Sequence, residues 1–473
     1  MIGNRADSEA LRLDDSPQFR RALGPLEGIC IVVGTVIGSG IFLTPSTIAS
    51  HMGQFGIGAI LLVWVVGGLL SLAGALAYAE LSAMFPQAGG QYVYLREAFG
   101  VRAAFLFGWM EFWVARAGSI AALGVAFANF FALFVHHDDE WTIRWTAFVV
   151  ISTITAINYL GVRWGGAVQT LFTATKVAAL ATLVVCCFGL PGGSPQNWQP
   201  MWTGVASPGL FMNALGMALV QSLWAYDGWT NGAAVSEEMK NPQRNVPNAL
   251  IGGTLLVIGI YLAANIAYHF VLPLNEVIAS KRVAADVAGS LSNPEIGTRL
   301  LAAAVMISTF GALNGTMLTG PRIFYAMARD SIFFHQMGQL HSRFRSPHWS
   351  ILFVGLWAGA LVLIPFDKVL NPIFGWKEDV KLYDQLLTFV IFGSWLFYGL
   401  TVAGVMRLRK LLPDHPRPYR SWGYPVVPTM FVVTSTAFII HTLRTQPAES
   451  LAGLALILAG LPAYAYWSKR RGE

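Results

Sequence analysis

The residues whose types and spacing best suggest chemistry are Gly38, Ser39 and Gly40, which stand together in the middle of an apolar stretch, residues 27 to 50. Glycine adopts backbone conformations that other residues avoid, so this cluster predicts a break in a helical segment. In a lipid environment, loose backbone is tolerated only where it is buried in protein or lines a cavity. The break therefore predicts N–H groups that donate hydrogen bonds to a polar solute held at this depth.

A second break is predicted in SLWAYDGWTNG, residues 222 to 232, where Asp227, Gly228 and Gly232 stand in a segment that should be apolar. A helix that ends midway exposes N–H donors at one new end and carbonyl acceptors at the other, with about half an elementary charge at each. A zwitterion such as the head group of an α-amino acid fits both ends. The alternative is that both segments are glycine-rich faces at which helices pack closely.

The expected contacts of that zwitterion follow from the two breaks. Its carboxylate would accept from the N–H groups around Ser39, Gly40 and Ile41, and its ammonium would bind carbonyls near Val36 and Ile37 and those of Trp224, Ala225 and Tyr226. Trp224 and Tyr226 also offer large surfaces to the ligand's side chain, although packing between helices is an alternative role.

Asp227 is the most unusual of these residues, because a carboxylate at this depth costs at least ~2.5 kcal/mol unless it is paired or hydrated. We hypothesise that it faces the cavity and binds the ligand's amino group or selects for a second positive charge. Capping of the broken helix, through hydrogen bonds to local N–H groups, is the equally open alternative.

Lys176 lies eight residues into the apolar segment 168–191, about 12 Å deep at the 1.5 Å rise of a helix. We expect its ammonium to bond the carbonyl end of the first broken segment and hydroxyls such as those of Ser308 and Thr309. A fixed internal cation would make transport independent of sodium, whereas a titrating lysine would couple it to protons. Snorkelling of the side chain to the inner surface is the alternative.

Glu111 and Arg116 are opposite charges five residues apart in another apolar segment. This spacing is poor for pairing on an α-helix, where neighbours are three or four apart, so each is expected to bond other segments. We expect a structural role for both rather than contact with a ligand.

The elements that must position these residues are membrane-spanning helices. Of 473 residues, 55% are hydrophobic and 12% charged, which excludes a soluble globule and indicates an all-α polytopic membrane protein. Twelve segments are predicted, near 27–50, 57–84, 104–134, 142–160, 168–191, 209–235, 248–272, 299–327, 349–366, 383–406, 425–443 and 449–467.

The distribution of Lys and Arg places both termini in the cytoplasm, because most of these cations fall in the tails and in alternate loops. The same rule accounts for the net charge of +6 without nucleic acid. Segments one and six are an odd number apart and so run in opposite directions, as in an inverted repeat of five plus five helices. The predicted divisions are 1–24 (cytoplasmic tail), 25–191 (first repeat), 209–410 (second repeat), 425–467 (two appended helices) and 468–473 (cytoplasmic tail).

Other classes of function find little support. The three cysteines, Cys30, Cys186 and Cys187, all fall within predicted spans, so we expect no disulfide framework, metal site or cofactor. No catalytic motif indicates an enzyme. A channel would need a continuous pore, whereas paired broken helices predict a site that can be closed off. An amino-acid-gated channel or a sensor with a transporter fold stays the non-carrier alternative.

The string VVGTVIGSGIFLTP (32–45) resembles the first-helix signature of the amino acid–polyamine–organocation superfamily, in particular its L-type amino acid transporter branch. The resemblance covers about residues 25 to 465. Further matching strings are AYAELSAMFPQAGGQYVYLREAFG (77–100), R-x-x-S-x-A from Arg116, T-x-x-K ending at Lys176, AYDGW with SEE (225–238), TFGALNGTMLTGPRIFYAMARD (309–330) and SPHWS (346–350).

The resemblance implies the leucine-transporter fold with twelve spans, and sodium-independent exchange or proton-coupled symport of amino acids by alternating access. It implies substrate contacts at Val36, Ile37, Gly38, Ser39, Gly40, Ile41, Ser119, Leu123, Trp224, Ala225, Tyr226, Asp227, Gly228, Phe392, Ser394 and Trp395. It also implies that Lys176 stands where relatives hold a sodium ion. Neutral L-amino acids are the first expectation, with cationic amino acids or amine conjugates as the alternative because of Asp227.

The sequence departs from the family at two places. Many members carry a small residue where Asp227 stands, so the substrate type does not transfer directly. Animal members join a heavy chain through a cysteine after the third span, but FVHHDDEW (134–141) contains none. We therefore expect no disulfide-linked heavy chain, and a bacterial inner-membrane protein whose partners are its substrate and the lipid bilayer.

Overall fold

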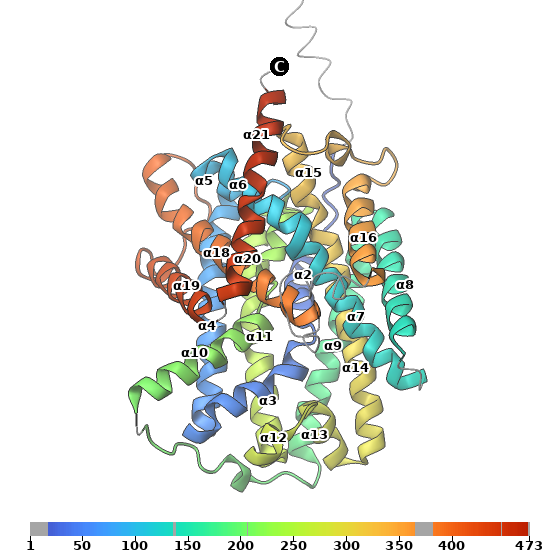
Figure 1. Ribbon diagram of the computed structural model, residues 1–473, viewed down its shortest axis with the longest axis vertical. Coiled ribbons are helices and arrows are strands. Elements are labelled where there is room, and N and C mark those ends of the chain that lie inside the picture. The colour runs from blue at the N-terminus through green and yellow to red at the C-terminus, as the bar shows by residue number, and fades with distance from the viewer. Residues whose placement is uncertain (1–17, 136–138, 206, 365–381, 446, 472–473) are drawn as a thin grey trace, which may run out of the picture.

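The computed structural model describes residues 18–135, 139–205, 207–364, 382–445 and 447–471. In these residues the chain forms helices joined by loops, and the only β-type contacts are two isolated bridges. Most of the predicted N-terminal tail, residues 1–17, lies outside the described residues, as do residues 472–473. Figure 1 shows the first residues that are described and the C-terminal end of α21 at the same end of the molecule. The described part of the chain is therefore all-helical, as predicted.

The first half of the chain covers the first five predicted segments. Its elements are α2 (Pro25–Val36), α3 (Gly40–Met52), η1 (Gly53–Phe55), α4 (Ile57–Met84), α5 (Gln91–Phe99), α6 (Val101–Met110), the π-helical turn η2 (Glu111–Arg116), α7 (Ala117–Val135), α8 (Glu140–Tyr159), α9 (Val162–Gly189) and η3 (Pro195–Trp198).

The second half covers the remaining predicted segments. Its elements are α10 (Pro208–Ala225), the 3₁₀ segment η4 (Trp229–Glu238), α11 (Pro242–Val271), α12 (Leu274–Ala279), α13 (Val283–Leu291), α14 (Pro294–Thr319), α15 (Pro321–Arg329), η5 (His335–Gly338), α16 (His348–Leu363), α18 (Leu382–Leu411), α19 (Val426–Thr445), α20 (Pro447–Leu458) and α21 (Gly460–Arg471).

Eight helices among the described residues are long and apolar enough to cross a membrane, and a ninth span is formed if α2 and α3, bent by 45°, count as one. The helix α16 is a shorter apolar helix. The predicted span 209–235 does not form one helix, because α10 ends at Ala225 and its continuation is η4. The chain is thus a multi-pass membrane protein by composition and helix length, and the count of twelve spans stays a prediction.

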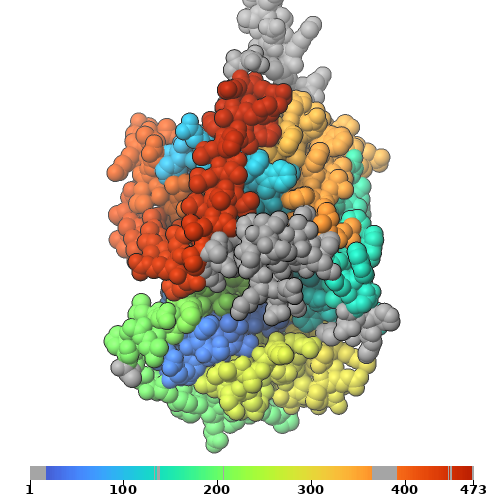
Figure 2. All heavy atoms as spheres, viewed as in Figure 1, coloured from blue at the N-terminus to red at the C-terminus, as the bar shows by residue number. Residues whose placement is uncertain are grey.

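The two broken segments lie in the centre of the molecule. The helix α2 packs on α9, α11, α14 and η4, and its residues from Cys30 to Val36 are all buried. By contrast, α3 packs on α10, α12 and α13, and Figure 2 shows it at the surface between these elements. The last two turns of α2, which lead into the break, are therefore enclosed by other helices, whereas α3 has one side at the surface.

A short strap, residues 18–23, fastens the start of the chain to the ends of later helices. The N–H of Leu23 donates to the carbonyl of Glu238 (3.0 Å), and that of Lys240 donates to the carbonyl of Leu23 (2.8 Å). The ring of Phe19 packs edge-on against Tyr325, with ring centroids 4.9 Å apart. Beside the strap, the buried Arg322 pairs with Glu238 at 2.8 Å. The strap therefore joins the start of the chain to η4 and α15.

Candidate functional site

The first break is short and lies against the second. The helix α2 ends at Val36, and α3 begins at Gly40 after three non-helical residues. A side chain at Gly40 would place its Cβ 2.8 Å from Cα of Ala225, at the end of α10. Only glycine allows the two broken segments to approach so closely, which explains the residue type at this position.

Lys176 of α9 is bound to the carbonyl end of α2. Its Nζ donates to the carbonyls of Gly34 (2.8 Å), Ile37 (2.6 Å) and Ser308 (3.0 Å), and the side chain is 2% exposed. These three bonds use all three ammonium protons, so the charge is satisfied inside the protein rather than at its surface. The geometry is that of an internal cation held by backbone oxygens.

Of the two hydroxyls expected near Lys176, that of Ser308 bonds the first break and that of Thr309 bonds its own helix. The Ser308 hydroxyl lies 2.8 Å from the carbonyl oxygens of both Ile37 and Gly38, to which it donates, and Lys176 bonds the Ser308 carbonyl instead. Thr309 donates to the carbonyl of Val305 in its own helix at 2.7 Å. Ser308 therefore supports the end of the first break, and the hydroxyl of Thr309 does not reach Lys176.

The second break depends on Gly228, whose φ of +107° is in the left-handed region. This conformation is strained for residues with a side chain, and a Cβ here would lie 3.1 Å from the carbonyl carbon of Thr35. The Thr35 hydroxyl lies 3.1 Å from the carbonyl oxygen of Gly228 and 2.8 Å from that of Ile31 in its own helix, so its one proton is shared between the two segments. The Tyr261 hydroxyl lies 3.1 Å from the carbonyl of Val36 and 3.0 Å from that of Ala225, and so bridges the two broken ends.

A cavity of about 100 Å³ lies between the breaks. A single water needs about 10 to 15 Å³ of such space, so the cavity has room for a small polar solute. Its walls come from Thr35, Val36, Gly38, Ser39, Gly40, Glu111, Ala115, Arg116, Ser119, Ala122, Leu123, Trp224, Ala225, Asp227, Gly228, Asn231, Thr316, Ser394 and Tyr398.

Most of the predicted contact residues line this cavity, from four parts of the chain. They are Val36, Gly38, Ser39, Gly40, Ser119, Leu123, Trp224, Ala225, Asp227, Gly228 and Ser394. At the start of α3, Gly40 and Ile41 belong to the first turn, whose N–H groups have no acceptor within the helix. The N–H groups around the first break therefore remain suited to an anionic group.

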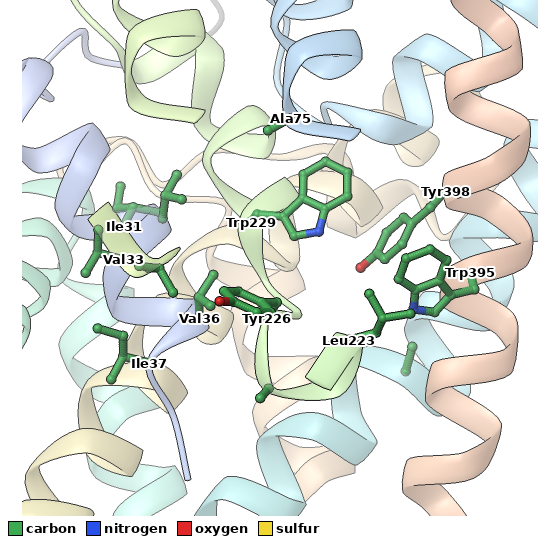
Figure 3. Packing of buried hydrophobic residues seen from close by; sticks show 14 of the residues in the cluster. Ile31, Val33, Val36, Ile37, Ala75, Leu223, Tyr226, Trp229, Trp395 and Tyr398 are labelled. Carbon is green, nitrogen blue, oxygen red and sulfur yellow. The ribbon is translucent and has the colours of Figure 1, made fainter. Parts of the chain in front are cut away.

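Five predicted contact residues are packed away from the cavity. Ile37, Ile41, Phe392 and Trp395 are buried among other apolar side chains. Tyr226 is 1% exposed and donates from its hydroxyl to the carbonyl of Trp64 at 3.1 Å. Figure 3 shows Tyr226 beside Val36, while Trp395 lies with Tyr398 on α18, at the other side of the view. Tyr226 still donates its N–H to the carbonyl of Ser222 at 2.9 Å and lies on the same helix face as Ser222, whose hydroxyl also bonds α4, so this face packs on α4 rather than on the cavity.

The charges of the third segment pair with each other, contrary to the expectation from their spacing. Arg116 Nη2 lies 2.7 Å from the carboxylate of Glu111, and Nε donates to the same oxygen at 3.0 Å. The prediction was wrong because residues 111–116 form a π-helical turn, whose wider coil has backbone hydrogen bonds between residues five apart and so brings side chains at this spacing closer together. Arg116 also donates to Asn231 at 2.9 Å, so the expected bond to another segment is formed as well.

Asp227 lines the cavity and is held by a neutral group. One of its carboxylate oxygens accepts from the hydroxyl of Tyr398 at 2.8 Å. Tyr398 was not predicted, although it stands four residues after Ser394 and so shares its helix face. That spacing is the signal that would have found it. Thr35, Ala115, Ala122, Asn231 and Thr316 were also missed, and Glu111 and Arg116, for which only a structural role was expected, line the cavity as well.

The arrangement offers hydrogen bonding and charge rather than covalent chemistry. In the described ranges, no group of three or more His, Cys, Asp and Glu side chains is placed to hold a metal ion. The cavity instead combines helix ends, hydroxyls and two carboxylates around a small volume. Such a site can bind and release a small polar molecule.

Comparison with known proteins gives consistent similarities over nearly the whole chain. Residues 23–459 match the family described as amino acid permease. The chain is 32% identical to the b(0,+)-type amino acid transporter 1 of Mus musculus, with 94% of this chain and 88% of the relative covered. It is 32% identical to the serine/threonine exchanger SteT of Bacillus subtilis (96% and 98% covered) and to the large neutral amino acids transporter small subunit 2 of mouse (96% and 82%).

Proposed function

The chain belongs to the amino acid permease family, and we propose that it exchanges L-amino acids across the plasma membrane by sodium-independent alternating access. The family and the relatives are transporters, so the protein is a membrane transporter and not an enzyme. The observation that carries the proposal is the cavity between two broken helices, because transporters bind substrate where discontinuous helices meet.

The head group of the amino acid would be bound mainly by the first break. The substrate carboxylate would accept from the N–H groups of Ser39, Gly40 and Ile41, at the positive end of α3. The ammonium would lie toward the carbonyls at the ends of α2 and α10. Because every amino acid carries this head group, these contacts support carriage of amino acids without selecting one.

The bonding of Lys176 supports independence from sodium. In transporters with broken helices, unwound backbone carbonyls coordinate the coupling sodium ion. Here the carbonyls of Gly34, Ile37 and Ser308 accept from Lys176 instead. A permanent internal ammonium would hold α2, α9 and α14 together without an ion from solution, whereas release of its proton during the cycle would give proton coupling.

Neutral amino acids are the proposed substrates, because the cavity is small and is lined by Ser119, Leu123, Trp224 and Ser394 beside the two breaks. A second candidate is favoured by one observation: Asp227 faces the cavity and its observed partner is the uncharged Tyr398. The cavity wall carries two carboxylates, Asp227 and Glu111, and one guanidinium, Arg116, which pairs with Glu111 and also attracts Asp227. A substrate with a second positive charge, such as a cationic amino acid, would balance the excess negative charge.

We also propose the finer architecture expected from the sequence: twelve spans, repeats over 25–191 and 209–410, the appended helices of 425–467, and both termini in the cytoplasm. The position of the first described residues and the end of α21 at one end of the molecule supports placing both termini on one side.

One relative is named as a small subunit, and this name implies a partner chain for that protein. Because residues 134–141 of this chain contain no cysteine, we propose that no heavy chain is linked here by a disulfide.

One transport experiment tests the function. Purified protein in liposomes loaded with single amino acids is given labelled substrate outside, at two pH values, with and without sodium. We expect uptake that saturates, that increases with a neutral amino acid inside, and that is unchanged by sodium. Sodium-stimulated uptake would contradict the role of Lys176, uptake that never saturates would favour a channel, and preference for cationic amino acids would favour the second candidate.

A further inference from the structure

A second and larger cavity lies outside the site between the breaks. Its volume is about 370 Å³, and its walls come from α3, α9, α13 and α14. On α9 the wall follows one helical face, including Ala179, Leu183 and Cys186, and α14 contributes Leu301 and Ala304. Lys176 bounds one end of the cavity, and its ammonium donates away from it, to carbonyls at the first break.

Water is poorly suited to this cavity. A buried water needs two to four polar partners, whereas most of this wall is apolar and its oxygen- or nitrogen-bearing side chains are those of Lys176, Thr182 and Ser292. Lys176 has no proton to offer, because all three donate to backbone carbonyls. The hydroxyl of Ser292 donates to the carbonyl of Ala288 at 2.8 Å. The chemistry of the wall therefore fits an apolar occupant.

The rim of the cavity continues into the apolar outer surface of the helices. Leu190 and Leu300, which line it, are 46% and 59% exposed. Val185, next in the α9 sequence to the lining residue Cys186, is 69% exposed, as expected for a face that meets hydrocarbon in a membrane protein. From Lys176 to Leu190 the cavity follows about 21 Å of chain at 1.5 Å per residue, so it is long rather than round.

We propose that this cavity binds one acyl chain of a membrane lipid, which enters from the bilayer between α9 and α14. An apolar cavity of about 150 Å³ holds a benzene ring, so by proportion this one holds about twelve to fifteen carbon atoms. The bound chain packs against Phe42 of α3 and thereby fills the space between α3 and the helices that hold Lys176. The site does not depend on which solute is transported.

Photolabelling in vesicles tests the proposal. The protein is reconstituted in phosphatidylethanolamine and phosphatidylglycerol with a trace of phosphatidylethanolamine that carries a diazirine either at the acyl-chain end or on the headgroup. After illumination, labelled peptides are mapped by mass spectrometry. We expect the chain-end probe to label the segments 180–183 and 301–304, and the headgroup probe to leave them unlabelled.

Matched variants show whether labelling comes from the cavity. Ala179→Phe fills it, whereas Ala178→Phe adds the same ring to the neighbouring exposed position, which does not line it. In Ala179→Phe we expect the labelling of 180–183 and 301–304 to be severalfold lower than in the wild type. In Ala178→Phe we expect wild-type labelling of both segments. Ala304→Phe, with Ala303→Phe as its control, repeats the test from α14 should the first variant fail to fold.

Labelling of the exposed face of α19, at Val433, should be equal in all variants and reports that the probe works. The proposal is overturned if the chain-end probe labels α19 but not the cavity, if the headgroup probe labels the cavity segments, or if both alanine variants of a pair lose labelling equally.

Discussion

The break between α2 and α3 and the break between α10 and η4 lie on opposite sides of one cavity, but their polar groups come from different sources. Around the first, backbone carbonyls are held by Lys176 and Ser308. Around the second, the carbonyl of Ala225 is likewise held by Tyr261, but polar side chains also bond one another at the cavity wall, Asp227 with Tyr398 and Asn231 with Arg116. Backbone groups are the same in any sequence, whereas side chains vary, so the first break suits the common head group and the second suits selection among substrates.

The role given to the backbone carbonyls of the first break depends most on Lys176. In Lys176→Met the carbonyls of Gly34, Ile37 and Ser308 lose a charged donor, and bonds to charged groups contribute about 1.5 to 3 kcal/mol each. We expect counter-flow of every substrate to fall at least about a hundredfold, because the three lost bonds together exceed the ~2.8 kcal/mol that corresponds to a factor of one hundred. Lys281→Met, at an exposed position, is the control. Wild-type exchange by folded Lys176→Met would contradict the role given to this ammonium.

Gly228→Ala tests whether the second break needs its backbone shape. A side chain at φ +107° costs about 1 to 2 kcal/mol, and its Cβ would press on Thr35 of the first segment. Exchange should fall about tenfold, with a lower melting temperature. Gly252→Ala in α11 is a matched control, because a Cβ there meets nothing within 4 Å. Equal behaviour of the two variants would mean that the left-handed turn is not needed.

Tyr261→Phe removes the hydroxyl that bridges the two broken ends. A single neutral hydrogen bond contributes about 0.5 to 1.5 kcal/mol, so we expect exchange to fall by about two- to tenfold for all substrates alike. Tyr268→Phe, on the same helix, removes a buried hydroxyl for which the described residues provide no hydrogen-bond partner. Exchange is measured by labelled counter-flow. Slower exchange in Tyr261→Phe alone would show that the bond between the two broken ends matters, and not merely a buried hydroxyl on this helix.

Asp227→Asn should have the smallest effect on neutral substrates. The amide oxygen can still accept from Tyr398, so neutral exchange should stay within about twofold, less than 0.5 kcal/mol. Exchange of a cationic amino acid, if the wild type performs it, should fall much more. A general loss of exchange would assign Asp227 to the head group and would remove the distinction between the two breaks. Tyr398→Phe, which keeps the carboxylate, separates the charge from its hydrogen bond.

The sequence predicts those features of the site that follow from residue type or from a residue's depth within a membrane-spanning segment. Glycine clusters in apolar segments indicated both breaks, and the depth of Lys176 indicated that it must be satisfied internally. Both follow from the cost of unpaired polar groups in lipid, which acts wherever the helices pack.

The features that the sequence did not predict depend on local helix geometry and on which helix face meets which neighbour. The π-helical turn brings Glu111 to Arg116, although they are five residues apart. Tyr226 keeps its helical bond to Ser222, and the face that carries both residues packs on α4, so its hydroxyl bonds Trp64 instead of facing the cavity. Local residue types do not determine either feature, because both depend on the packing of neighbouring helices.

The strap at residues 18–23 has a consequence for kinetics. Its bonds to Glu238 and Lys240 are made by backbone groups, so substitutions in the strap leave the donors and acceptors in place. The amide hydrogen of Leu23 exchanges with solvent only when the strap leaves η4. Its deuterium uptake therefore measures how often this end of the molecule opens, and substrate turnover should accelerate that uptake.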